Sequence, residues 1–155
     1  MDFFDDFSFQ EKSALITLLA ILFVYGGYFA ELVSGGGAAT LAGMLAAMIA
    51  AVVLLVIIEV ASHIVIAIFD AEGAEEGTDE RDLLVSGRAA RISQVILGVG
   101  VLVVLGRILV RGSMDEVAGM AEVTLFEVAN LLLFFFVLSE LVNYGARLFF
   151  YRRGV

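Results

Sequence analysis

The sequence contains no cysteine and no proline. The lack of cysteine excludes disulfides, thiolate metal sites, iron–sulfur clusters and cysteine nucleophiles. The lack of proline removes the commonest cause of a break in a long helix. Tryptophan is missing too, so phenylalanine and tyrosine are the residues left to anchor the chain at a membrane interface.

Charged residues are scarce, at 17% of the chain, whereas 61% of the residues are hydrophobic. Soluble domains usually contain about a quarter charged residues and just under half apolar ones. This excess excludes a water-soluble enzyme. The formal net charge of -9 also argues against a nucleic-acid partner, because phosphates need a basic surface. We therefore expect the lipid bilayer to be the main partner of this chain.

Four apolar stretches are long enough to cross a bilayer core, which takes about 20 helical residues. They cover about residues 14–32, 38–69, 92–110 and 123–150. They do not alternate as membrane strands do, and backbone in lipid must satisfy its own hydrogen bonds. The sequence predicts a single integral-membrane domain over residues 1–155, with an all-α fold that is a four-transmembrane-helix bundle.

Lysine and arginine predict the orientation of these spans. One side of a four-span protein holds seven of them: Lys12, Arg81, Arg88, Arg91, Arg147, Arg152 and Arg153. The other side holds only Arg107 and Arg111. Because basic loops stay in the cytoplasm, both the N-terminus and the C-terminus are predicted to be cytoplasmic. The N-terminus is acidic where a signal peptide is basic, so the first span is expected to be retained.

The segment between the second and third spans is acidic. Thr78 or Asp79 is placed to cap a short helix there, which we expect to lie at the interface or to run directly into the third span. Arg88 and Arg91 are three residues apart and share a helical face at the membrane boundary. Together with Arg152 and Arg153 they are expected to bind lipid phosphates, with an anionic ligand or partner as the alternative.

The second span contains small residues at every fourth position: Ala39, Gly43, Ala47 and Ala51. A parallel row runs beside them: Ala38, Ala42, Ala46 and Ala50. Small residues at this spacing let helix backbones approach closely in lipid. The rows predict close packing within the bundle or, alternatively, a face for self-association.

Ionisable residues inside spans suggest a functional site, because they are costly in lipid. Glu59 and His63 share one face of the second span, and Glu140, Asn143 and Arg147 share one face of the fourth. Glu59 and Glu140 are expected at similar depth, so Glu59 or His63 is predicted to reach Glu140 or Asn143 directly or through water. Three interpretations stay open: a structural polar network, a proton or cation site, and a metal site. The Glu-x-x-x-His spacing does not match the Glu-x-x-His pairs of di-metal bundles.

Other polar residues lie near the opposite boundary. Arg107 is expected to pair with Glu127 or Glu31, and Asn130 to form hydrogen bonds across helices. Gly98 and Gly100 lie within an apolar span and are interpreted as a packing feature. The sequence contains no Ser-His-Asp set, phosphate loop or nucleotide fingerprint.

Four short motifs follow one another between residues 78 and 154. They are Asp79-Glu80-Arg81-Asp82, Arg88-Ala89-Ala90-Arg91-Ile92, Asn130-Leu131-Leu132 and Tyr151-Arg152-Arg153-Gly154. In order and spacing they resemble an uncharacterised prokaryotic family of small predicted four-helix membrane proteins, a domain-of-unknown-function family. The resemblance implies a four-helix membrane fold and no known activity, cofactor or catalytic residue. Together with the apolar runs and the basic asymmetry, it leads us to expect a multi-pass protein of the prokaryotic inner membrane. It marks Arg88, Arg91, Asn130 and Arg152 as pattern positions without assigning them roles.

These observations predict a non-enzymatic integral membrane protein, without cofactor or metal. It would act as a small homo-oligomer or as an accessory subunit of a membrane complex. The alternative is a proton or cation transporter or channel that uses Glu59, His63 and Glu140. A second alternative is a metal-binding membrane protein, with a single zinc as the simplest case.

Overall fold

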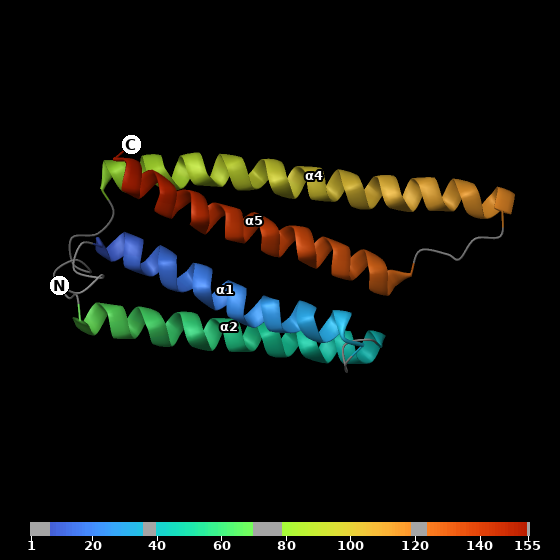
Figure 1. Ribbon diagram of the computed structural model, residues 1–155, viewed down its shortest axis with the longest axis horizontal. Helices are drawn as coiled ribbons and strands as arrows, with labels where there is room; N and C mark the ends of the chain where they lie inside the picture. Colours follow the sequence, from blue (N-terminus) through green and yellow to red (C-terminus); the bar gives the residue numbers. More distant parts are fainter. Residues whose placement is uncertain (1–6, 36–39, 70–78, 119–123, 155) are drawn as a thin grey trace.

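The computed structural model describes residues 7–35, 40–69, 79–118 and 124–154. They form four helices: α1 (Phe9–Val33), α2 (Leu41–Phe69), α4 (Glu80–Ala118) and α5 (Leu125–Arg153). Successive helices run in opposite directions, so α1 begins and α5 ends at the same end of the bundle, which we call the terminal end (Figure 1). The predicted all-α fold with four membrane-length helices is confirmed.

Local capping explains where the helices begin and end. Ser8 and Glu11 form a reciprocal capping box, so α1 begins at Phe9 rather than at the predicted position 14. The Thr124 side chain accepts a hydrogen bond from the backbone of Glu127 at the start of α5. At the end of α5, Gly154 has a φ of 67°, a left-handed conformation that glycine adopts without strain.

The described part of the acidic segment, from Asp79 on, leads into one long helix that continues through the third span. Asp79 caps α4 by exchanging hydrogen bonds with Asp82, at 2.7 and 3.1 Å. Of the two caps considered, Asp79 has this role, and of the two arrangements expected, the helix runs directly into the span. Thr78 lies outside the described residues. The 39 residues of α4 measure about 58 Å at 1.5 Å per residue, far more than a bilayer core of about 30 Å. The predicted range 92–110 covers only its apolar middle.

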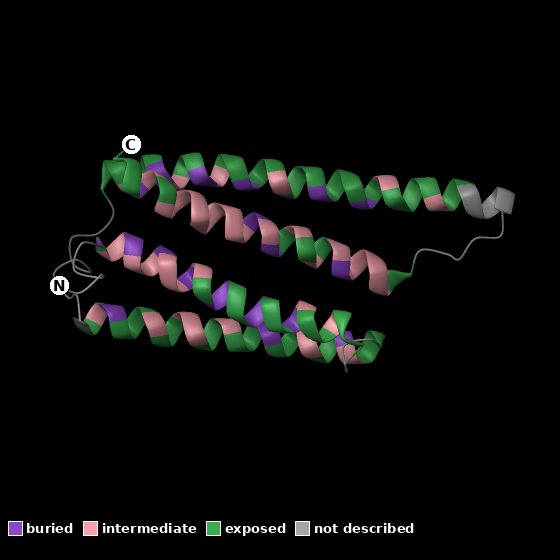
Figure 2. Ribbon diagram, viewed as in Figure 1, coloured by how far each residue is buried: buried purple, intermediate pink, exposed green. Residues whose placement is uncertain are grey.

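The helices pack in the order α4, α5, α1, α2. Extensive contacts join α4 to α5, α5 to α1 and α1 to α2. The central position of α5 is visible in Figure 2, where most of its residues are of intermediate burial while the outer faces of α2 and α4 are exposed. Helix α1 therefore packs between α5 and α2, and side chains from these three helices line a half-open cavity.

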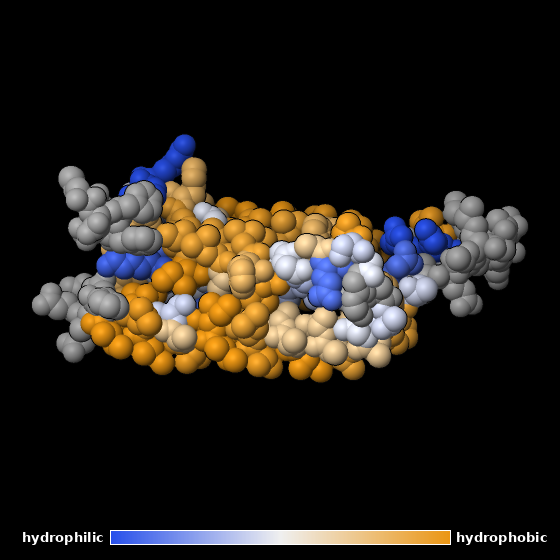
Figure 3. Space-filling view, turned by 60° about the horizontal axis from the view of Figure 1, so that its bottom comes forward, coloured by the Kyte–Doolittle hydropathy of each residue, from blue (hydrophilic) through white to orange (hydrophobic). Residues whose placement is uncertain are grey.

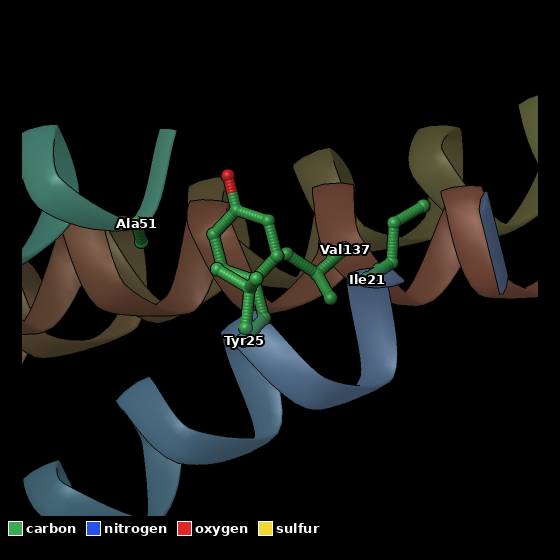
Figure 4. Close-up of a cluster of buried hydrophobic side chains, with 5 residues drawn as sticks. Ile21, Tyr25, Ala51 and Val137 are labelled. Carbon is green, nitrogen blue, oxygen red and sulfur yellow. The ribbon is translucent and has the colours of Figure 1, made fainter. Parts of the chain in front are cut away.

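The apolar core lies where α1 meets α2 and α5. Ile21 and Tyr25 of α1 reach toward Val137 of α5, with Ala51 of α2 beside them (Figure 4). Val24 completes this buried cluster. The small side chain of Ala51 lets the α2 backbone approach the Tyr25 ring, as expected for close helix packing in lipid.

Most large apolar side chains on the outer helices face outward. Ile68 on α2 is 70% exposed and Leu109 on α4 is 71% exposed. In Figure 3 apolar side chains cover most of the visible face, and hydrophilic ones gather toward the ends. All four helices are long and apolar enough to cross a membrane. An apolar surface of this extent suits lipid and not water, so the chain is a multi-pass membrane protein.

Candidate functional site

A cavity of about 270 Å³ lies between α1, α2 and α5. Two carboxylates and one aliphatic hydroxyl line it, one from each helix: Thr17, Glu59 and Glu140. The rest of its wall is aliphatic or aromatic: Ile21, Leu55, Val137, Tyr25, Phe136 and Tyr144. The cavity therefore places two carboxylates among mainly apolar groups.

The cavity lies well inside the membrane-length part of the bundle. From the terminal end of their helices, Thr17, Glu59 and Glu140 are about 12, 15 and 20 Å away, at 1.5 Å per residue. This depth matches the sequence-based expectation that Glu59 and Glu140 reach similar levels. At such depth a carboxylate without a partner costs several kcal/mol, roughly, so each oxygen needs a donor, a proton or a cation.

Glu59 has one such donor. The hydroxyl of Thr17 donates a hydrogen bond of 2.9 Å to Oε2 of Glu59. The other oxygen, Oε1, is buried and has no hydrogen-bond partner among the described residues. Since Oε1 belongs to a side chain that lines the cavity, a ligand there can supply what the protein does not.

His63 belongs to the α1–α2 contact and is not among the residues that line the cavity. Its Nε2 lies 3.0 Å from the Ser13 hydroxyl, and its Nδ1 lies 2.8 Å from the backbone oxygen of Glu59. The distance from Nδ1 to the Glu59 carboxylate is 3.7 Å. The imidazole is exposed, so it adjoins the Glu59 carboxylate from outside the cavity.

The hydroxyls on α1 are site residues that the sequence analysis missed. Ser13 and Thr17 are four residues apart, as are Glu59 and His63, and the two pairs meet in antiparallel register. A signal was available: polar residues at the same spacing on two helices joined by a short loop. Among the described residues, no direct hydrogen bond joins Glu59 or His63 to Glu140 or Asn143; a bridging water stays a prediction.

Asn143 and Arg147 lie next to the cavity instead of lining it. The Arg147 guanidinium stands over the Tyr144 ring, 5.1 Å from its centroid. Asn143 Oδ1 and Arg147 Nε are buried, and neither has a hydrogen-bond partner in the described part of the chain. Arg147 therefore contacts the site through the Tyr144 ring.

The small-residue row of α2 faces inward at its centre. Ala51 is buried in the core cluster, and Gly43 and Ala47 are half-buried. Ala38 of the neighbouring row and Ala39 of this row lie outside the described residues. The neighbouring row, made of Ala42, Ala46 and Ala50, is exposed. The two rows thus have different surroundings, one within the bundle and the other on its outer face.

The four arginines assigned to lipid phosphate are all exposed, in the part of the bundle near the terminal end: Arg88, Arg91, Arg152 and Arg153. Arg152 Nε lies 3.3 Å from Glu11 Oε1, and its guanidinium is 3.9 Å from the centroid of the Phe7 ring. Arg152 therefore connects the end of α5 to the start of α1.

Two predictions near the opposite end are confirmed. The Arg107 guanidinium donates to Glu127 at 2.8 Å, joining α4 to α5. Asn130 accepts a hydrogen bond of 2.8 Å from the Tyr28 hydroxyl and donates to Met44 Sδ at 2.9 Å. Asn130 thereby links three helices, and neither group belongs to the cavity.

The described residues contain no group of three or more His, Asp and Glu side chains that could hold a metal ion. No family model, no curated protein and no solved structure matches this chain. The resemblance to a family of small four-helix membrane proteins therefore stays a prediction.

Proposed function

We propose that this protein is a non-enzymatic membrane protein that binds a proton or another cation at Glu59 and Glu140 and moves it through the membrane. One observation carries the proposal: both carboxylates line the same intramembrane cavity. The described residues that line this cavity include no Lys, Arg or His, so no basic side chain within it neutralises them.

The energetic reason lies in the surroundings of Glu59. An ionised carboxylate in an apolar, membrane-embedded pocket is unfavourable unless it is paired. Thr17 satisfies only one of the two oxygens, and Oε1 lacks a partner among the described residues. Binding of a proton or cation removes this cost, which makes occupancy of the cavity favourable.

The proposed setting is the inner membrane of a prokaryotic cell, with both termini cytoplasmic. Seven of the nine Lys and Arg residues belong to the terminal end by sequence, which favours that side for the cytoplasm. Reporter fusions at each terminus test the orientation, and an external location of either terminus would contradict it.

Proteoliposome flux tests the function. Purified protein is reconstituted, and uptake of protons, sodium and potassium is followed with entrapped dyes. We expect flux in the wild type and a loss of flux in Glu59→Gln and Glu140→Gln. Glu80→Gln is the matched control, because Glu80 is exposed at the start of α4, away from the cavity.

The flux result is decisive only for folded protein, so each variant is checked for helix content and for insertion into the liposomes. Flux that persists unchanged in both cavity variants would contradict the role of the carboxylates. Absence of wild-type flux for all three cations would remove the transport proposal.

Assembly with other membrane subunits is a second candidate, either by self-association into a small homo-oligomer or as an accessory subunit of a larger complex. It is favoured by the exposed row that contains Ala42, Ala46 and Ala50, since small residues allow close approach of a partner helix. Ala46→Leu should reduce crosslinked oligomers without unfolding the chain. Ala47→Leu, on the half-buried row, should destabilise each subunit instead. Protein that stays monomeric across concentrations would exclude self-association.

The metal alternative is tested by elemental analysis. Protein purified without added metal should contain zinc or iron if that alternative is correct. Folded protein free of both metals would contradict it.

A further inference from the structure

The wall of the cavity indicates which kind of cation it suits. Six of its nine lining side chains are aliphatic or aromatic, among them Tyr25, Phe136 and Tyr144. Only Thr17, Glu59 and Glu140 offer aliphatic hydroxyl or carboxylate oxygens, and the Thr17 hydroxyl already donates to Glu59. The chemistry of the wall is therefore mainly that of a hydrocarbon and aromatic pocket with a negative charge.

A metal cation fits this wall poorly. Calcium takes six to eight oxygen ligands, and magnesium keeps several waters around it. Calcium and magnesium are bound mainly by carboxylates, carbonyl groups and waters, and of these the described lining offers only the carboxylates of Glu59 and Glu140. Its other oxygens are the hydroxyls of Thr17, Tyr25 and Tyr144. The same residues contain no group of three acidic or histidine ligands.

An organic ammonium ion fits the same wall well. Its charged head is attracted both to carboxylates and to the faces of aromatic rings, and its carbon groups gain from contact with apolar side chains. Tyr144 and Phe136 line the cavity from α5 together with Glu140, and Tyr25 lines it from α1. Ligand pockets of this type are mainly apolar, with a few polar groups that fix the orientation.

We propose that the cavity binds a small organic ammonium ion, with the charge beside Glu59 and Glu140 and the carbon groups against the aromatic and aliphatic wall. The proposal rests on the cation-binding function proposed for this site. The volume of about 270 Å³ is just below the range of drug-sized pockets, about 300–1,000 Å³. An amine with a single ring is therefore the expected size.

Equilibrium dialysis of the full-length protein in detergent tests this inference, with radiolabelled benzyltrimethylammonium as the probe. This probe has one ring and a permanent charge. We expect saturable binding at one site per chain. Benzylamine should displace the probe, whereas neutral benzyl alcohol and sodium chloride at the same concentration should not.

Variants assign the binding to the cavity. Glu59→Gln and Glu140→Gln should each weaken binding, and the exposed control Glu80→Gln should leave it unchanged. Tyr144→Leu should also weaken binding because it removes a ring face, while Tyr144→Phe should restore it. If a carboxylate variant fails to fold, the competition between benzylamine and benzyl alcohol on wild-type protein still decides the question.

The outcomes separate the two proposals. Carboxylate-dependent flux of protons or sodium without saturable probe binding would overturn the organic ammonium ligand and leave the cation-binding function standing. Displacement of the probe by sodium or by benzyl alcohol as readily as by benzylamine would also overturn it. If wild-type protein shows neither cation flux nor probe binding, both proposals are overturned.

Discussion

Gly100 is the position where α4 approaches α5 most tightly among the described glycines. A Cβ atom added there would overlap Cβ and Cγ of Phe135 and would lie 2.7 Å from its Cδ1. Rotation of the Phe135 ring cannot remove this overlap, because Cβ of Phe135 is fixed to the backbone of α5. In Gly100→Ala the two helices must therefore move apart.

The expected change in the free energy of unfolding follows from two opposing effects. Inserting atoms into a packed contact typically costs about 1–3 kcal/mol. Replacing glycine by alanine within a helix favours folding by about 1 kcal/mol. Gly98 provides a matched control, because a Cβ at Gly98 meets nothing within 4 Å and receives the same helix benefit. We therefore expect Gly100→Ala to have a free energy of unfolding about 1–3 kcal/mol below that of Gly98→Ala.

Unfolding by increasing SDS in mixed micelles, followed by circular dichroism, measures this difference. Gly98→Ala should be as stable as the wild type or slightly more stable. A Gly100→Ala variant that equals or exceeds Gly98→Ala in stability would refute the reasoning, because it would mean that α4 and α5 do not approach as closely as the Phe135 contact requires.

Three further predictions concern polar contacts. Tyr28→Phe and Asn130→Leu should each destabilise the protein, and their double-mutant cycle should give a coupling energy of about 0.6–1.7 kcal/mol; a value near zero would contradict the Tyr28–Asn130 hydrogen bond. Arg107→Gln should leave the stability almost unchanged, because both side chains of the pair with Glu127 are exposed, and a clear loss of stability in the same SDS titration would contradict this expectation. Thr17→Val should lower both stability and cation flux, whereas Thr17→Ser should retain them; equal behaviour of the two variants would show that the hydroxyl is dispensable.

The site was only partly predictable from the sequence. Glu59 and Glu140 stand out because charge is rare within apolar spans, and similar distances from the span ends place them at similar depth. Asn143 and Arg147 share a face with Glu140 by spacing but do not line the cavity. Spacing defines a face of a helix and not the neighbour that this face meets, so it could not separate the side chains that line the cavity from those beside it.

The sequence by itself determined the all-helical fold with four membrane-length helices, and it indicated the start of one of them, at Asp79. The start of α1 was predicted too late, although the Ser8 cap that sets it is also local. Continuous apolar runs decide helix formation in lipid, and the caps at Ser8 and Asp79 act over three residues, so both properties are local. The four-residue spacing of Glu59 and His63 also placed them on a common face of one helix.

The tertiary structure alone decided which helices are neighbours. Because α5 packs between α4 and α1, Glu140 comes to the same cavity as Glu59, and Thr17 supplies the donor from α1. Gly100 gains its importance in the same way, from the Phe135 side chain of another helix. The outer faces of the four helices are similarly apolar, so helix order depends on the fit of small and large side chains across each contact, which no single stretch of sequence contains.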